Sequence, residues 1–324
     1  MKGMVRFGAG LLAPAGERAR LSILIYHRVL PAPDPLLPWE WDAQLFEQHL
    51  RLLSEYFSPL TLTEAVQRLR RNALPARAVC VTFDDGYADN HEVALPILRR
   101  YAMPATFFVT TGTLDGGCLW NDQLIEALRL VPGPRLDLTA LGLGSHDVGD
   151  LRARREALTR ILLRVKHRPP PERADLVGAV CELAGLERAP SLMMTSKQVR
   201  ELHEAGMVIG GHTVTHPILS RLAPQAARKE ICDGKDHLEA LLGERVTLFA
   251  YPNGRPGQDY TAEHVKQVRA AGFEGACSTA WGAGGARADV HQLPRFTPWD
   301  RHPFRFALRL MSNLARGPED RVVC

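Results

Sequence analysis

Seven short β-rich segments recur along the chain, separated mostly by stretches with helical periodicity. Several of them are continuous apolar runs, which is the pattern of parallel strands covered on both faces. The seven predicted strands are residues 22–27, 78–83, 105–110, 207–211, 246–251, 274–279 and 291–296. Strands that alternate with helices predict an α/β barrel or a doubly wound parallel sheet.

Helical patterns fill most of the gaps between these strands. Phe46, Leu50 and Leu53 fall on one helical face, as do Ala94, Leu95, Leu98 and Tyr101. The stretch 224–242 is a long amphipathic segment followed by Gly243. A glycine directly after a helix is typical of a left-handed cap, so a helix is predicted to end there.

The stretch from about 115 to 195 interrupts this alternation. It contains no convincing strand and is predicted to be a helical insertion into a main α/β domain over 21–300. Residues 1–20 are read as an N-terminal extension, and 301–324 as a C-terminal helix and tail. The insertion also holds seven basic residues between Arg152 and Arg168. Such a cluster is more typical of a solvated helix face than of a surface for an anionic substrate or membrane headgroups.

The composition argues against several classes of protein. A net charge of +4 over 324 residues gives no reason to expect a nucleic-acid partner. The six cysteines form no CxxC pair, so zinc-finger spacing is absent and reduced thiols are expected. No signal peptide or membrane-spanning run is recognised, which favours a cytoplasmic protein. Membrane association is possible but unsupported by the sequence, and the oligomeric state is not indicated.

Two adjacent aspartates, Asp84 and Asp85, stand at the end of the apolar strand 78–83, directly before Gly86. In α/β folds the carboxyl ends of the strands are where active sites are built. If the chain turns there, both carboxylates can face one crevice. The alternative is an ordinary turn, for which Asp and Gly are common residues.

His212 and His216 follow another apolar strand and two glycines. Their spacing of four would place both imidazoles on one side of a helical turn. Two histidines and one carboxylate predict a divalent metal ion, with Zn²⁺ the first expectation, and three protein ligands leave room for a catalytic water. The second aspartate could then act as general base. The same ligand set also suits non-heme iron oxygenases, so the ligands alone leave the reaction open.

The pair TFDDG and HTVTHP, in this order, resembles the first two signature motifs of the polysaccharide deacetylase family, also called NodB-like or carbohydrate esterase family four. The resemblance covers residues 20–300 outside the insertion and implies a distorted barrel of about seven β/α units. It implies Asp84 as catalytic base and Asp85, His212 and His216 as metal ligands. The likeness also places Thr213 beside the first histidine and His27, in LIYHRVLP, at the barrel mouth.

Two supporting positions depart from the family pattern. The segment FAYPNG, residues 249–254, matches the third motif at Pro252 and Gly254, but Ala250 replaces its arginine and Asn253 its tyrosine. The candidates for substrate binding are Thr213, Tyr251, Pro252 and Asn253. In the last motif, LPRF puts Arg295 near the usual histidine. Arg295 is predicted to brace Asp84 from another strand, and His27 or His291 could supply the general acid.

The resemblance implies hydrolysis of an acetyl group, most simply an N-acetyl amide, from an acetylated polysaccharide or carbohydrate precursor. Two alternatives stay open. Some relatives cleave other C–N bonds in small cyclic amides, and loss of the third-motif arginine suits a carbohydrate-binding protein with a degenerate site.

Overall fold

The computed structural model describes residues 10–316, which divide into two compact units. Unit 1 comprises residues up to Ala32, Trp41–Leu114 and the chain from Met194 onward. Unit 2 comprises Pro33–Glu40 and Asp115–Met193. The outer parts of the predicted extension and tail, residues 1–9 and 317–324 with Cys324, lie outside the described residues. None of the described helices is long and apolar enough to cross a membrane.

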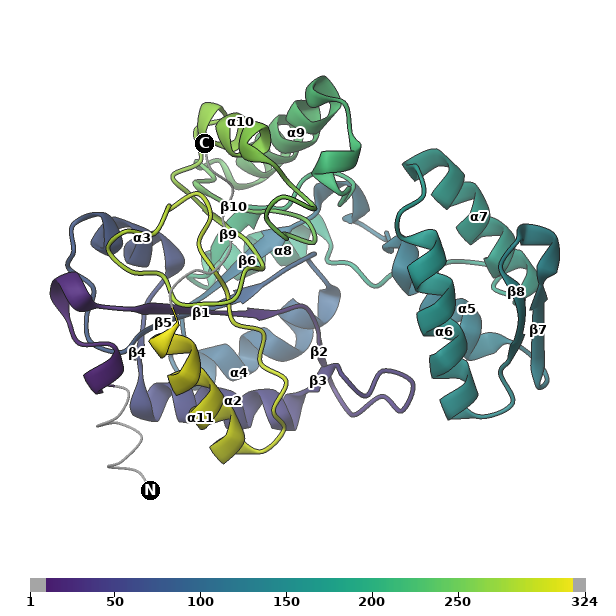
Figure 1. Cartoon of the computed structure of the whole chain (residues 1–324), viewed down its shortest axis with the longest axis horizontal. Helices are drawn as coiled ribbons and strands as arrows, with labels where there is room; N and C mark the ends of the chain where they lie inside the picture. The colour runs from purple at the N-terminus through teal and green to yellow at the C-terminus, as the bar shows by residue number, and fades with distance from the viewer. Residues whose placement is uncertain (1–9, 317–324) are drawn as a thin grey trace. The chain divides into compact units, whose positions relative to one another are not determined.

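Unit 1 is built on a curled parallel sheet, visible in Figure 1. Its main path runs β1-β5-β6-β9-β10-β11, and the short β4 pairs with the start of β5. These strands are β1 (Leu21–Tyr26), β4 (Ser58–Pro59), β5 (Ala78–Phe83), β6 (Ala105–Val109), β9 (Val208–Gly211), β10 (Leu248–Ala250) and β11 (Gly275–Cys277). A separate pair joins β2 (Val29–Leu30) to β3 (Trp41–Asp42). Both long strands, β1 and β5, are buried along their whole length, as their continuous apolar sequences predict.

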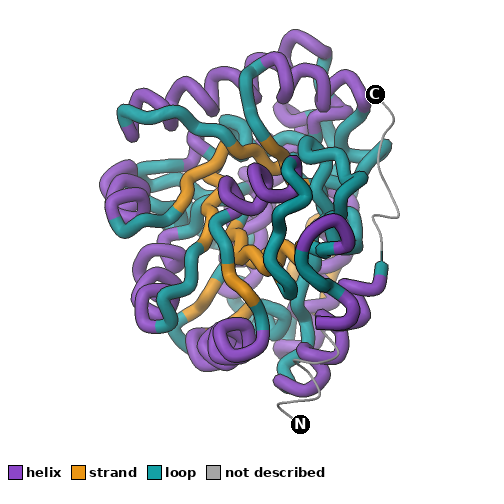
Figure 2. The backbone as a smooth tube through the Cα atoms, turned by 90° about the vertical axis from the view of Figure 1, so that its left-hand side faces the viewer, coloured by secondary structure: helices purple, strands orange, loops and turns teal. Residues whose placement is uncertain are grey.

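Helices surround this sheet on its outer side, which Figure 2 shows as purple coils around the orange strands. They are α2 (Ala43–Tyr56), α3 (Leu62–Arg70), α4 (Leu95–Arg100), α8 (Ser196–Glu204), α9 (Pro224–Leu242), α10 (Ala262–Ala270) and α11 (Pro303–Ala315). Single turns are η1 (Gly16–Arg18), η2 (Asn90–Ala94), η3 (Thr111–Thr113) and η5 (Leu219–Arg221). The predicted face of Phe46, Leu50 and Leu53 is buried in α2, and α9 ends at Gly243 with φ 70°, as expected.

The segment 291–296 is not the seventh strand that the sequence predicted, but it links the two edges of the sheet. Leu293 exchanges backbone hydrogen bonds with Ala276 and Ser278, around β11, and Phe296 with Ile23 and Ile25 of β1. Pro294, between them, has no N–H to donate, so the ladder is limited to isolated bridges. The sheet is therefore a distorted barrel whose last segment pairs at only two residues.

Unit 2 packs its own core from helices and one hairpin. The helices are α5 (Trp120–Leu130), α6 (Leu151–Val165) and α7 (Pro170–Leu183), and the hairpin joins β7 (Arg135–Leu138) to β8 (Gly144–Asp147) through the turn η4 (Thr139–Leu141). The prediction that this stretch has no strand is wrong. Leu136 and Leu138 point inward between charged neighbours, and four residues of alternation are too few to stand out in the sequence.

Some arginines of the predicted basic cluster in unit 2 donate hydrogen bonds to backbone carbonyls, and others face solvent. Arg154 donates to the carbonyls of Leu128 and Val131 at the end of α5, and Arg164 donates to Leu143 at 2.9 Å. Cationic groups are favourable at a helix C-terminus, where carbonyl oxygens lack partners. Arg152 and Arg160 do lie exposed and pair with Glu156.

Candidate active site

Asp84 and Asp85 come together because the chain reverses at the end of β5. Asp84 still belongs to the sheet, since its N–H donates to Tyr26 at 3.0 Å. Asp85 then has φ 75° and Gly86 has φ 91°, both in the left-handed region that aspartate and glycine tolerate best. The carbonyl of Asp85 accepts from Thr110 at the end of β6, which fixes the turn. Both carboxylates are thereby buried at the carboxyl end of the barrel.

His212 and His216 also come together, but not on a helical turn as predicted from their spacing. The segment is a loop in which Thr213 has φ 67° and His216 has φ 55°. These two left-handed residues bring the imidazole ring centroids to 4.9 Å. Non-glycine residues in this conformation are strained and persist only when their surroundings hold them.

Two neighbouring elements, α9 and η3, hold this histidine loop. Glu230 of α9 accepts from the backbone N–H groups of Val214 and Thr215 at 2.9 and 2.8 Å, and from the Thr215 hydroxyl at 2.8 Å. Beyond β6, Gly112 donates to Val214 at 2.7 Å. Gly234 of α9 lies so close that an added Cβ would be 3.0 Å from the Thr213 carbonyl carbon. The loop is therefore clamped by a carboxylate and two glycines.

Asp85, His212 and His216 present three metal-ligating atoms to one point. Asp85 Oδ1 lies 3.3 Å from His212 Nε2 and 3.2 Å from His216 Nε2, and the ligand atoms of the cluster all lie within 4.8 Å of one another. The Nδ1 of His212 is 2.7 Å from the Ala250 carbonyl, which can only accept, so Nδ1 carries a proton and the lone pair of the neutral ring is on Nε2. Asp85 Oδ1 is buried and has no hydrogen-bond donor. Lone pairs converging in this way fit a divalent cation with open positions for water.

Arg295 forms a two-pronged ion pair with Asp84. Its Nη1 is 2.7 Å from Oδ1 and its Nη2 is 2.7 Å from Oδ2. The guanidinium is only 1% exposed, and its Nε donates to Ser278 at 2.9 Å. Two parallel N–H···O bonds fix both the position and the orientation of the carboxylate. The segment that closes the barrel thus supplies a cation where Ala250 of β10 cannot.

The charges of the cluster keep both carboxylates ionised. Burial raises the pKa of Asp84, but Arg295 and His212 lower it by a larger amount, so the pKa lies below its ordinary value. Burial also raises the pKa of Asp85, but His216 and His212 lower it by more, so this pKa too lies below its ordinary value. Burial lowers the pKa of His216 to about 4, which leaves its imidazole neutral, the form that binds metals. For His212 burial lowers the pKa, yet Asp84 and Asp85 raise it on balance. Two carboxylates therefore favour a positive charge at this point.

The other predicted site residues take different positions. His27 is exposed at the end of β1, and a positive charge there lowers the pKa of both aspartates. Thr213 and Tyr251 are buried, so neither presents a side chain to a ligand. Pro252 is buried and Asn253 half-buried in the loop after β10. His291 pairs with the Phe273 carbonyl ahead of β11, at the opposite end of the barrel from Asp84, and cannot be the acid.

Three polar residues around the site were not identified from the sequence. Glu230 clamps the histidine loop, as described above. Asp89 binds Arg28 at 2.8 Å and the Val29 N–H at 3.0 Å, and Asn90 donates to the His27 carbonyl at 2.8 Å. Asp89 and Asn90 lie in the same TFDDGYADN run as the catalytic candidates. Their position one turn after the aspartates was the available signal that they support the same site.

The chain is similar in sequence to known proteins. The sequence profile described as polysaccharide deacetylase matches residues 71–137 and 173–276. YxkH of Bacillus subtilis (strain 168), named for the same family, is 24% identical over 279 residues, which are 86% of this chain and 71% of that protein. A poly-beta-1,6-N-acetyl-D-glucosamine N-deacetylase of Staphylococcus aureus is 30% identical over 107 residues, 33% of this chain and 37% of that protein.

Two solved structures share the fold over nearly their whole length. The Streptococcus pyogenes deacetylase PplD in complex with acetate has a TM-score of 0.60 at 24% identity and covers 91% of this chain and 98% of that one. IcaB from Ammonifex degensii has a TM-score of 0.59 at 20% identity, with 94% and 99% covered. Since the family profile spans more than half of the sequence, the chain belongs to the polysaccharide deacetylase family.

Proposed function

We propose that this protein is a metal-dependent hydrolase that removes acetyl groups, specifically N-acetyl groups, from a polysaccharide or a carbohydrate precursor. The observation that carries the proposal is the paired arrangement at the barrel mouth. A carboxylate held by Arg295 stands next in sequence to a three-ligand cluster whose lone pairs converge. That combination offers a general base beside a site for a Lewis acid.

Asp84 is the residue we assign as general base. A divalent ion bound by Asp85, His212 and His216, with zinc our first candidate, would polarise the acetyl carbonyl and lower the pKa of a water molecule. Asp84 is ionised, is held in place by Arg295, and still has lone pairs free to take the proton of the attacking water. Arg295 acts as a positioning residue in this scheme, because it contacts the base and not the substrate.

The backbone N–H of Asn253 is the donor we assign to the developing oxyanion. In the loop after β10, the Tyr251 N–H donates to Cys277, Pro252 has none, and the Gly254 N–H donates to Pro252. The Asn253 N–H alone among these four residues has no partner in the described part of the chain. The loop starts directly after Ala250, whose carbonyl binds the ring of His212, so it borders the cluster.

His27 is our candidate for the acid that protonates the leaving amine. It is exposed at the barrel mouth, and a positive charge there lowers the pKa of both aspartates. The hydrogen bond from Asn90 to its carbonyl fixes the backbone there. Its ring is open to solvent, which suits a group that must take up a proton again after each turnover.

The substrate class is taken by analogy from the relatives. One of them is named an N-deacetylase of poly-beta-1,6-N-acetyl-D-glucosamine, and a deacetylase of the same fold was solved in complex with acetate, the product that such a reaction releases. A cytoplasmic location, predicted from the sequence, likewise remains part of the proposal.

A joint measurement of metal content and acetate release tests the proposal. Purified protein should hold close to one divalent ion per chain and release acetate from N-acetylglucosamine oligomers, while chelator-treated protein should release none until metal returns. A protein that binds one ion and the oligomers but releases no acetate would be a carbohydrate-binding homologue instead. Release of ammonia or ring opening of cyclic amides would point to the other C–N hydrolases.

Arg295→Lys is predicted to lower kcat by about 10- to 100-fold, with metal content unchanged. Lysine keeps the charge but cannot donate the two parallel hydrogen bonds that orient Asp84. Arg295→Gln also removes the charge that lowers the pKa of Asp84, so the acidic limb of its kcat/KM profile should move to higher pH. Unchanged kcat and an unmoved limb in both variants would show that Arg295 only supports the fold.

Glu230→Ala is predicted to weaken metal affinity by about 10- to 100-fold while leaving kcat at saturating metal largely intact. The variant frees a loop that carries both histidines in a strained conformation. Competition titration with a chromophoric chelator measures this affinity. Asp233→Asn, on the same helix with a half-exposed side chain that pairs with Lys229, is the matched control and should bind metal normally.

A further inference from the structure

The exposed large apolar side chains of unit 1 are confined to its N-terminal segment and to the region of α11. Among the described residues of this unit, five such side chains are exposed: Leu11 (67%), Leu12 (39%), Trp299 (51%), Phe304 (37%) and Leu308 (45%). Single exposed apolar residues are common on protein surfaces. A restriction of all five to two segments is not, and it indicates an interaction surface.

Helix α11 is apolar on both of its sides. Phe306, Leu310 and Leu314 are buried in the core of unit 1. The opposite side presents Phe304 and Leu308 to solvent, one helical turn apart. A helix on a water-exposed surface normally carries polar residues on its outer side. The apolar residues on the outer side of α11 therefore favour contact with an apolar partner.

Arginines accompany these apolar residues. The segments 11–20, 285–287 and 299–316 carry seven arginines against two carboxylates, Glu17 and Asp300, an excess larger than the net charge of +4 of the whole chain. Arg18, Arg20, Arg287 and Arg305 make no ion pair with any described carboxylate. We call these three segments together the basic face.

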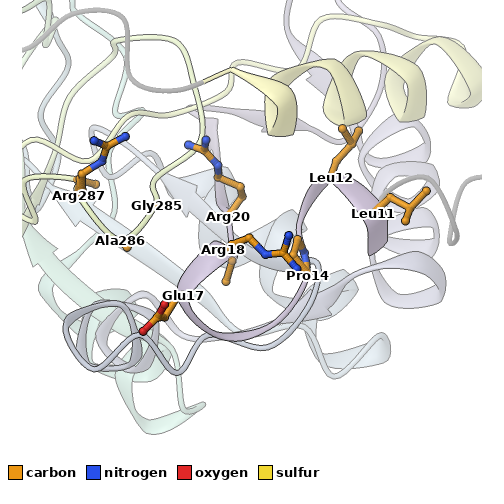
Figure 3. Close-up of a pocket in the computed structure, with 11 residues that line it drawn as sticks. Leu11, Leu12, Pro14, Glu17, Arg18, Arg20, Gly285, Ala286 and Arg287 are labelled. Carbon is orange, nitrogen blue, oxygen red and sulfur yellow. The ribbon is translucent and has the colours of Figure 1, made fainter.

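Two cavities and a backbone hydrogen bond join the three segments into one surface. A cavity of about 630 Å³ is lined by Leu11, Leu12, Arg18, Arg20 and Arg287, among others. Figure 3 shows Leu11 and Leu12 on one side of it and Arg20 and Arg287 on the other. A second cavity, of about 530 Å³, lies between Trp281 and α11. The chain from 281 to 287 connects the two, and Ala283 donates to Arg316 at the end of α11.

Trp299 adds an interfacial feature to this surface. Its ring stacks on Trp281 with centroids 4.8 Å apart, and the Arg309 guanidinium lies 4.8 Å from its centroid, yet half of the residue remains exposed. Tryptophans with one apolar and one polar side are typical of the boundary between a bilayer and water.

We infer that the basic face docks unit 1 onto an anionic lipid surface. Exposed leucine, phenylalanine and tryptophan side chains would enter the boundary between headgroups and acyl chains, while the arginines would pair with lipid phosphates. Both parts of the pattern are needed for this partner, because an anionic soluble ligand would not require the apolar side of α11. The inference does not depend on the deacetylase proposal.

The basic face shares no residue with the candidate active site. Arg20 precedes the first residue of β1, whereas Asp84 pairs with Tyr26 at the other end of the same strand. Six residues of extended chain span about 20 Å. Substitutions at Arg20 and its neighbour Arg18 are therefore expected to leave turnover of a small soluble substrate unchanged.

Vesicle co-sedimentation of the full chain tests the inference. The protein should partition onto phosphatidylcholine vesicles containing about one third phosphatidylglycerol, and weakly onto phosphatidylcholine alone. Replacing Arg18, Arg20 and Arg305 by glutamine should reduce partitioning on the order of 100-fold, at about fivefold for each charge near the surface. Phe304→Ser with Leu308→Ser should also reduce it, without changing the charge.

The matched control removes three exposed arginines from unit 2: Arg152, Arg160 and Arg168, each replaced by glutamine. It has the same net charge as the triple variant of the basic face and should bind vesicles like the unmodified protein. Equal loss of binding in both triple variants would overturn the inference, because net charge alone would then explain it. Binding of inorganic phosphate by titration, without binding of vesicles, would equally overturn it.

Discussion

Replacing His216 by alanine is expected to remove the bound divalent ion and to reduce acetate release by more than the 10- to 100-fold that loss of an outer-shell partner costs. His216 supplies one of three ligand atoms, and no other described histidine or carboxylate completes the cluster with Asp85 and His212. Metal content after dialysis and turnover of N-acetylated oligomers would be measured on the same sample.

His216 is a cleaner test of the metal than His212. The ring of His212 also donates to the buried Ala250 carbonyl, so His212→Ala leaves that acceptor unpaired at a cost of about 1–3 kcal/mol. His216 has no such second bond among the described contacts, so its loss should change metal binding with little loss of fold. His237→Ala, exposed on α9, controls for loss of a histidine as such. Full metal content in His216→Ala would remove the basis of the proposed chemistry.

The order of elements was predictable because the barrel strands are continuous apolar runs. Both faces of such a strand are buried, so nearly every residue is apolar. The strand can therefore be recognised without knowing which residues point to which face. The segment 291–296 shows the limit of this signal. Its apolar residues suggested a strand, but Pro294 restricts it to one pairing residue on each side. Arg295 still reaches Asp84, because the segment closes the barrel and so ends at the same mouth.

The histidine pair was predicted to converge, but by the wrong local structure. A spacing of four suggests a helical turn, whereas Thr213 and His216 adopt left-handed conformations in a loop. Nothing in HTVTH itself specifies those conformations. They are imposed by Glu230, fourteen residues beyond His216, and by Gly112, about a hundred residues before it. Local sequence cannot report constraints that arise only when distant elements pack.

The same limit applies to charged residues in unit 2. Arg154 and Arg164 belong to a run that the sequence favours as a solvated face, yet both donate to backbone carbonyls of neighbouring elements. Only the packing of α6 against the end of α5 and against the hairpin determines which arginines are used in this way.

Asp84→Asn is expected to lower kcat by about 10²- to 10⁴-fold while the divalent ion stays bound, because asparagine keeps the size of the side chain but cannot accept the proton of the attacking water. The ligands Asp85, His212 and His216 are untouched by the change. The measurements are initial rates of acetate release at saturating metal and the metal content of the same preparation.

The ion pair with Arg295 complicates this test and also provides its control. Asp84→Asn leaves a guanidinium that is 1% exposed without a carboxylate, and an unpaired buried charge is strongly destabilising. The double variant Asp84→Asn with Arg295→Met removes both charges and should recover part of the lost melting temperature. Because the base is still missing, its kcat should remain as low as that of Asp84→Asn. If the double variant regained activity together with stability, the rate loss would have come from the fold, and another group would have to activate the water.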